Sequence, residues 1–188
     1  MKESSLLFKI ELLGVSPPVW RRFFVPPDLV LGHFHEAIQI VMGWDNGHLY
    51  EFTIGKERFM PEPDDDDTLD AWEYQLHQVV KRKGQAMGYL YDFGDSWEHK
   101  LKLENLKYSP PVGDGRIIGC LDGGRACPPE DVGGVWGYEE FLKALAKPHL
   151  KKNKELVEWY EADEPFDSER FDLAKVNDRL AKEFSRVP

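Results

Sequence analysis

One hairpin pattern near the middle of the chain most constrains the fold. Residues 97–103 alternate strictly, with apolar side chains and His99 on one strand face and charged side chains on the other. A period of two is typical of a strand with one buried face. Residues 87–93 form a second strand-like run, and the Gly-Asp-Ser of residues 94–96 supplies a turn between them. The chain is therefore predicted to build an antiparallel sheet with one dry face.

The N-terminal part adds two strands, a helix and a third strand. Residues 6–13 and 20–25 are strand-like and a Pro-Pro pair separates them. Residues 31–42 carry apolar side chains at helical spacing, and Gly43 is placed to end that helix. Alternation returns in residues 48–54, which predicts another strand with His48 on its apolar face. This order gives a ββαβ start.

The rest of the chain is loop-rich and then helical. An acidic loop is predicted over residues 61–70, followed by a weakly patterned helix over 72–83. Glycine and proline predict a long loop over 110–134 with one short strand at 116–121. Three apolar stripes then predict helices around residues 138–145, 156–160 and 173–180, the last with Asp172 as its N-cap. We expect one α+β domain over 1–188, with a mostly antiparallel sheet core in about 5–135, a helix across one face and helices in about 136–186.

Composition bounds the function. The chain has 188 residues, 41% of them hydrophobic, and a net charge of −10. This composition indicates a folded, acidic protein and argues against a uniformly basic nucleic-acid surface, although a local basic patch stays open. No signal peptide or membrane span is visible, and two cysteines do not make a disulfide framework. We expect a cytoplasmic protein with no membrane partner, for which a protein partner is plausible and nucleic acid is disfavoured.

Two short stretches concentrate the residues that carry chemistry. Residues 92–99 read Asp-Phe-Gly-Asp-Ser-Trp-Glu-His, and residues 120–131 combine two cysteines with carboxylates, glycines and prolines. Carboxylates and histidine serve as general acids and bases or as metal ligands, whereas aspartates beside glycine also cap turns. The partners of a kinase motif, a phosphate-binding loop and a serine-hydrolase elbow are all missing. The catalytic candidates are Asp92, Asp95, His99 and Asp131.

The cysteines and inward histidines suggest a metal site. Cys120 and Cys127 are seven residues apart, which is not the Cys-x-x-Cys spacing of a zinc knuckle. A wide loop can still bring both thiolates to one zinc ion, with His48 and His99 as the other predicted ligands. Free thiols and a disulfide are the alternatives for the cysteines, and ordinary hydrogen bonding is the alternative for the histidines. Candidate ligand-binding residues are Arg21, Trp97, Arg125 and Tyr138.

Several segments together resemble one known family, the plasmid pRiA4b ORF-3-like proteins of bacteria and archaea. The resemblance runs over about residues 6–180. It is carried by segments 17–22, 35–44, 48–52, 91–99, 120–134 and 137–142, and by the signature residues Arg21, His35, Trp44, His48, Asp92, Gly94, Asp95, Trp97, His99, Gly124, Pro129, Asp131, Gly133, Gly134 and Tyr138. The family is associated with plasmids and transposons through genomic context and naming. The resemblance implies no catalytic role, because none is established for the family, but it favours a shared site.

Three functions fit these observations. A binding or interaction module of a plasmid- and transposon-associated family is the first, supported by the mobile-element association and the basic-aromatic run 20–22. A metal-dependent or acid–base enzyme, hydrolase-like, is the second and would use the 92–99 and 120–131 segments. In the third, these segments only lock a hairpin against a covering loop.

Overall fold

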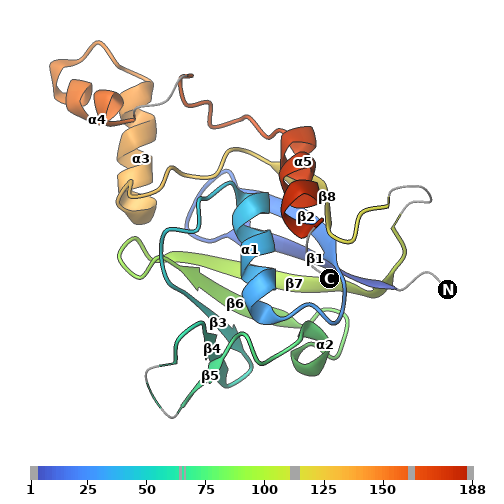
Figure 1. The fold of residues 1–188 in the computed structure, drawn as a ribbon. Coiled ribbons are helices and arrows are strands. Elements are labelled where there is room, and N and C mark those ends of the chain that lie inside the picture. The colour runs from blue at the N-terminus through green and yellow to red at the C-terminus, as the bar shows by residue number, and fades with distance from the viewer. Residues whose placement is uncertain (1–3, 64, 66, 111–114, 161–163, 186–188) are drawn as a thin grey trace.

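The computed structural model describes residues 4–63, 65, 67–110, 115–160 and 164–185. The chain folds as a single α+β domain around one eight-stranded sheet, in the order β5-β4-β3-β6-β7-β1-β2-β8 (Figure 1). The strands are β1 (Ser5–Leu12), β2 (Trp20–Val25), β3 (Tyr50–Ile54), β4 (Glu57–Met60), β5 (Thr68–Asp70), β6 (Ala86–Tyr91), β7 (Trp97–Tyr108) and β8 (Gly119–Gly124). Neighbouring strands are antiparallel except β4 and β5, which are parallel. The predicted fold class, including its ββαβ start, is confirmed.

One face of the sheet holds the hydrophobic core, and α1 (Leu31–Met42) crosses it (Figure 1). Phe8 of β1 and Phe23 of β2 pair across the strands, and both rings pack against Phe34 of α1 with centroids 5.0 and 5.8 Å away. The helix ends at Gly43, as predicted, with a left-handed φ of 113° that favours glycine. The alternating pattern of β7 puts Trp97 and His99 on this same buried face.

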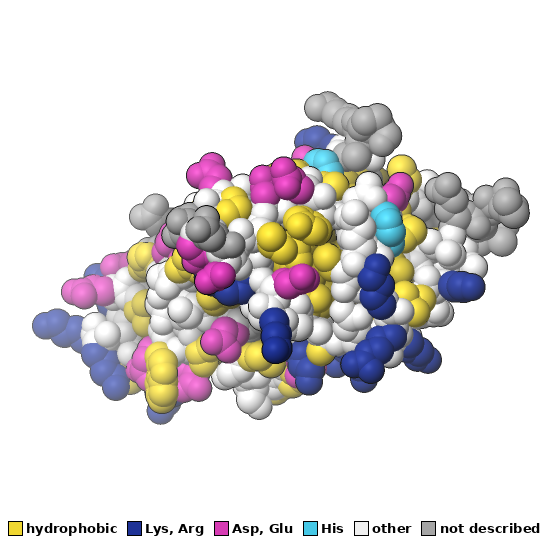
Figure 2. Space-filling model, turned by 90° about the horizontal axis from the view of Figure 1, so that it is seen from below, with side chains coloured by type: hydrophobic (Ala, Val, Ile, Leu, Met, Phe, Trp, Pro, Cys, Tyr) yellow, Lys and Arg dark blue, Asp and Glu magenta, His cyan; other side chains and the backbone are white. Residues whose placement is uncertain are grey.

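The opposite face of the sheet is polar. Lys9 pairs with Glu11 at 2.9 Å along β1, and Arg22 of β2 pairs with Glu104 of β7 at 2.8 Å. Acidic side chains also lie among basic ones on the side of the molecule seen in Figure 2, with hydrophobic side chains scattered between them. Charges of both signs neutralise each other locally, so these surfaces are solvated rather than uniformly basic.

The segment from residue 57 to 83 differs from its prediction. Strand β5 lies inside the predicted acidic loop, and β4 covers residues for which no element was predicted. The helix predicted over 72–83 shrinks to the four-residue α2 (Leu76–Val79). Backbone hydrogen bonds from Leu76 to Leu29 and from His77 to Pro27 hold the segment against the start of α1. Pairing with distant backbone replaces helical hydrogen bonding here, which local patterning does not reveal. Within the four-aspartate run, Asp64 and Asp66 lie outside the described residues.

Strand β8 begins three residues later than predicted and ends in two glycines. Gly123 and Gly124 pair with Arg21 and Trp20 of β2. A Cβ added at Gly123 would sit 2.7 Å from the Arg21 side chain, and one at Gly124 would sit 2.8 Å from the Trp20 ring. Glycine is therefore required at these two strand positions, because any side chain there would clash with the side chains of β2.

The C-terminal third is helical, as predicted. It contains α3 (Gly134–Leu145), a 3-10 turn η1 (Lys151–Asn153), α4 (Lys154–Trp159) and α5 (Leu173–Phe184). Helix α5 packs against β8 and α1, whereas α3 and α4 project from the sheet (Figure 1). The Asp172 side chain accepts a hydrogen bond from the Lys175 amide, which confirms the predicted N-cap. Among the described residues, none of the helices has the length and apolar content to cross a bilayer.

Candidate functional site

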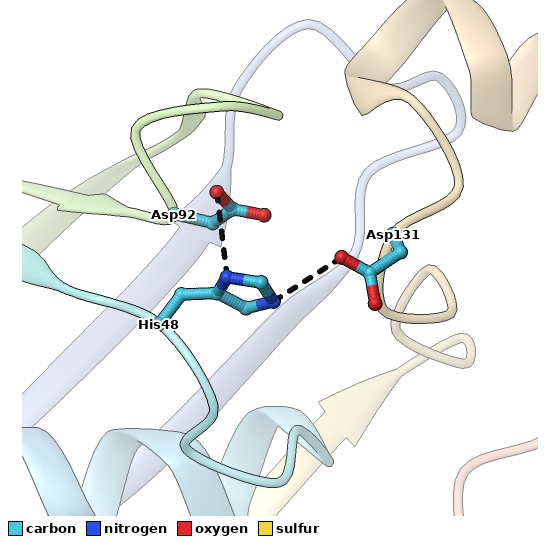
Figure 3. A group of neighbouring side chains, drawn as sticks. All are labelled: His48, Asp92 and Asp131. Carbon is cyan, nitrogen blue, oxygen red and sulfur yellow. Dashed lines mark ion pairs between the residues drawn. The ribbon is translucent and has the colours of Figure 1, made fainter.

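Three loops meet at one end of the sheet, where His48 lies between two aspartates. His48 comes from the segment before β3, Asp92 from the β6–β7 turn and Asp131 from the loop between β8 and α3 (Figure 3). One ligand atom from each lies within 4.8 Å of the others. The two chemically dense stretches of the sequence therefore each contribute one carboxylate to the same point.

The imidazole faces a carboxylate on each side. His48 Nδ1 lies 3.7 Å from Asp92 Oδ1, and Nε2 lies 3.3 Å from Asp131 Oδ1 and 3.8 Å from Glu130 Oε2. Asp92 is nearly buried, with a 9% exposed side chain, whereas His48 is 32% and Asp131 is 71% exposed. The cluster is thus open to solvent on the Asp131 side and closed beneath Asp92.

Sheet pairing explains why His48 and Asp92 meet. Strands β3 and β6 are neighbours, with Tyr50 opposite Tyr91, and the Asp92 amide donates to the Leu49 carbonyl at 2.9 Å. Asp92 has a φ of 56°, which is uncommon for a residue other than glycine. Its carboxylate accepts the Gly94 amide at 2.9 Å, as predicted for an aspartate capping its own turn. This bond leaves Asp92 held in one orientation beside His48.

Glu130 anchors the third loop to the sheet. Its Oε1 accepts hydrogen bonds from the Tyr91 hydroxyl at 3.0 Å and from the Asp45 amide at 3.0 Å. Its Oε2 is buried and accepts no hydrogen bond from the described residues, and it points to the His48 side of the site. Burial and the adjacent Glu130 charge raise the pKa of Tyr91 well above its usual value, so this phenol stays protonated and donates.

The β6–β7 turn is docked against the loop that carries Asp131. The Asp95 carboxylate accepts the Gly133 amide at 3.1 Å. A Cβ at Gly134 would lie 2.5 Å from the Asp95 carbonyl oxygen, and Gly134 has a φ of 66°. Both the close approach and the backbone conformation require glycine at this position. The glycines therefore set the spacing between Asp92 and Asp131.

A buried polar network supports the segment that leads to His48. His35 of α1 contacts the Tyr89 hydroxyl at 2.8 Å and bonds to Asn46, and its ring stacks on Tyr50 with centroids 3.6 Å apart. Gln39 donates to the same Tyr89 hydroxyl at 2.9 Å and accepts the Asn46 amide at 3.1 Å. Burial lowers the pKa of His35 to about 4, so the ring is neutral near pH 7. His35 has the ordinary hydrogen-bonding role and positions the residues before His48.

The sequence matches the family of plasmid pRiA4b ORF-3-like proteins over residues 4–175. The chain belongs to this family. An uncharacterized protein of Sinorhizobium fredii, y4hQ, is similar, with 39% identity over 193 residues that cover 99% of this chain and 97% of the relative. The crystal structure of MM3350 from Methanosarcina mazei Go1, a protein of unknown function, is also similar, with a TM-score of 0.81 and 34% identity over 94% of this chain and 98% of that one.

Several residues on which the predicted resemblance rests lie in this corner of the fold. His48, Asp92 and Asp131 form the cluster, and Asp95 and Gly134 belong to the docked loops. The Trp44 indole is buried beneath them and donates to the Pro128 carbonyl at 3.0 Å. The predicted resemblance and the geometry therefore converge on one place in the fold.

Of the four residues predicted to bind zinc, only His48 belongs to the three-residue cluster found among the described residues. The structure places His48 ahead of β3 and one-third exposed, rather than on the buried face predicted for it. His99 is buried on β7, where its Nδ1 lies 3.2 Å from the Tyr89 carbonyl and burial lowers its pKa to about 3. Cys120 and Cys127 are free cysteines, and burial raises the pKa of the Cys120 thiol to about 11.

Three of the four predicted ligand-binding residues are buried, and the fourth is held by hydrogen bonds. Arg21 is 2% exposed, and Trp97 and Tyr138 are buried with their Nε1 and hydroxyl lacking a partner among the described residues. Arg125 donates to Glu169 at 2.9 Å and to the Pro17 carbonyl at 2.8 Å. In this conformation their side chains hold structure together. Their role as ligand-binding residues stays a prediction.

Tyr91 and Asn46 are parts of the site that the sequence does not single out. Tyr91 follows the alternation of β6 and reads as a core residue, although its hydroxyl reaches Glu130. In the sequence Asn46 stands beside a glycine, a pattern that indicates a turn, and its φ of 61° agrees with one. That pattern does not predict its side-chain bond to His35. Their part in the site becomes visible only when the strands are paired.

Proposed function

We propose that the protein binds a divalent metal ion through His48, Asp92 and Asp131 and uses it in hydrolase-like chemistry. The observation that carries this proposal is the convergence of two carboxylates, from segments nearly forty residues apart, on one imidazole. One nitrogen and two carboxylate oxygens suit zinc, manganese or iron better than calcium or magnesium. Three protein ligands also leave room for a water molecule or a substrate atom.

The residues around the cluster support this chemistry and indicate the charge of the substrate. A bound ion would lower the pKa of a coordinated water and would so supply a nucleophile near neutral pH. Glu130 lies next to His48 and can accept a proton from such a water. The carboxylates of Asp92, Glu130 and Asp131 line the site, so a neutral or cationic substrate fits better than a polyphosphate.

Metal titration of the stripped protein tests the proposal. The unaltered protein should bind about one equivalent of Zn²⁺ or Mn²⁺ in calorimetry after chelator treatment. His48→Ala and Asp131→Asn should each weaken binding by about 10-fold or more. His149→Ala, an exposed histidine outside the cluster, is the matched control and should bind normally. Fewer than about 0.2 equivalents on the unaltered protein, or equal binding by all variants, would contradict the proposal.

A second candidate is an interaction module, as the mobile-element association of the family suggests. Exposed apolar side chains near the site favour it: Trp136 is 82%, Leu49 is 52% and Phe93 is 44% exposed. Large exposed aromatics are typical of binding surfaces. If this function is the right one, Trp136→Ser should abolish co-purification of a partner from the native host while His48→Ala leaves it intact. If the protein is a metal-dependent enzyme, His48→Ala should abolish its activity and Trp136→Ser should leave that activity intact.

A further inference from the structure

A cavity separate from the metal cluster lies between α1 and the C-terminal segment. Its volume is about 550 Å³, within the range of small-molecule sites. The end of α1, the loop after β8, residues 164–172 and the first turns of α5 form its walls. In Figure 1 this is the region where the C-terminal segment returns from α4 and α5 lies beside α1. His48, Asp92 and Asp131 do not line it.

A buried cation without a carboxylate partner lies at the base of this cavity. Arg21 is 2% exposed and lines the cavity. Its guanidinium donates to the carbonyls of Val41, Met42, Trp20 and Gly124, and Phe171 stacks on it at 4.2 Å. None of the described carboxylates forms an ion pair with Arg21. Carbonyl dipoles compensate the charge only in part, so the base of the cavity is electropositive.

The acidic residues of the lining already have hydrogen-bond or ion-pair partners, whereas Lys175 and Arg179 on α5 are weakly paired or not paired among the described residues. Glu164 pairs with Arg170, and the carboxylates of Asp167 and Asp172 cap backbone amides. Lys175 forms no ion pair with a described residue. Within the described part of the chain, Arg179 forms an ion pair with Asp45 alone, at 4.0 Å, and Asp45 is 86% exposed. The capped carboxylates keep their charge, and the lining holds four basic side chains against three acidic ones. The formal excess is one positive charge, and Lys175 and Arg179 place it on the α5 side.

Apolar side chains supply the rest of the lining. Ile40 and Met42 come from α1, Phe166 and Phe171 from the C-terminal segment, and Val176 from α5. A ring or other flat apolar group would be enclosed by these side chains, with its charged group toward Lys175 and Arg179. A fully hydrated inorganic ion would leave this apolar surface uncovered.

We propose that this cavity binds a small organic anion, an aromatic ring that carries one carboxylate or phosphate. Two basic side chains one turn apart on α5 select the charge: Lys175, which has no ion pair with a described residue, and Arg179, whose pair with the exposed Asp45 is long. An anion there replaces lost hydration with direct ion pairs. The aromatic and aliphatic walls select the ring through apolar burial and stacking. This ligand class contrasts with the neutral or cationic substrate proposed for the metal cluster, so the two sites bind different molecules.

Binding of benzoate and phenyl phosphate tests the inference, with benzyl alcohol as the neutral probe. Either anion should bind in calorimetry, with cross-peak shifts confined to α5 and residues 164–172 in NMR, and the alcohol should bind at least about 10-fold more weakly. The anion with the higher affinity shows whether the site prefers a carboxylate or a phosphate on its ligand. The double variant Lys175→Met/Arg179→Met should lose the preference for anions over the alcohol, while Lys182→Met, on the same helix but outside the cavity, should keep it.

Three results would overturn the inference: no binding by either anion, equal binding of benzyl alcohol, or full retention of anion binding by a folded double variant. Circular dichroism should show that the double variant keeps its helical content. His48→Ala should bind the anions normally. Loss of anion binding in His48→Ala would show that the probes occupy the metal cluster instead, and would contradict a separate site.

Discussion

At the scale of single residues, two buried histidines link the stability of the protein to pH. His35 and His99 are each 2% exposed, and their ring partners are neutral oxygens and a ring face rather than carboxylates. Burial lowers the pKa of His35 to about 4 and that of His99 to about 3. Both rings are therefore neutral in the folded state at a pH where the unfolded chain begins to bind protons.

We predict that the contribution of these two histidines to the free energy of unfolding is complete above about pH 6.5 and is lost as the pH drops below that value. Each histidine contributes up to about 1.4 kcal/mol per pH unit, so the pair should cost about 4 kcal/mol between pH 7 and pH 5. Denaturant unfolding at several pH values measures this loss. In NMR titration the ring signals of His35 and His99 should stay in their neutral positions down to pH 5. Titration of either ring near pH 6.5 would contradict the prediction.

At the scale of elements, Arg21 joins the second strand to the end of the first helix. Its guanidinium donates from β2 to the Val41 and Met42 carbonyls, which close α1, and to Gly124 of β8. A positive charge at the C-terminus of a helix is also favourable for the helix dipole. The forked guanidinium donates to four carbonyls in all, one more than the three N–H groups of an ammonium can supply.

We therefore predict that Arg21→Lys lowers the free energy of unfolding by about 2–4 kcal/mol, because buried carbonyls lose their donors. Arg22→Lys is the matched control. Arg22 is adjacent in sequence but lies on the polar face and makes a partly exposed ion pair with Glu104, so its replacement should cost less than about 1 kcal/mol. Denaturant titration of both variants gives the comparison. Equal losses would show that the fork of Arg21 is dispensable.

At the scale of the whole molecule, charge argues against nucleic acid as the partner. The net charge is −10, the candidate site is lined with carboxylates, and acidic side chains are mixed with basic ones on the face seen in Figure 2. Phosphate contacts need clustered positive charge. In the predicted basic-aromatic start, Arg22 pairs with Glu104 and Arg21 is buried, so neither guanidinium is free on the surface.

We predict that the purified protein binds duplex DNA no more tightly than about 10⁻⁴ M at physiological salt, the weak end of non-specific binding. Fluorescence anisotropy with a labelled duplex measures this affinity at low and physiological salt. Micromolar binding that weakens steeply with added salt would overturn the prediction and would restore a nucleic-acid function.

Sequence patterns predicted the elements where burial follows a local period. The alternation of residues 97–103 put Trp97 and His99 inside, Gly43 ended α1 and Asp172 capped α5, all because one or two neighbouring residues determine each feature. The same reasoning missed β4 and β5 and put His48 on a buried face. Short edge strands form by pairing with distant backbone, and His48 lies just before the strand whose period was assigned to it.

The chain by itself determined that carboxylates and a histidine would concentrate in residues 92–99 and 120–131, and that one sheet face would be dry. Only the tertiary structure decided that Asp92 and Asp131 meet at His48 and leave His99 and both cysteines out of the cluster. That choice depends on β3 lying beside β6 and on glycines that let two loops touch. Strand order and loop contact are long-range properties of the backbone, and side-chain periodicity does not encode them.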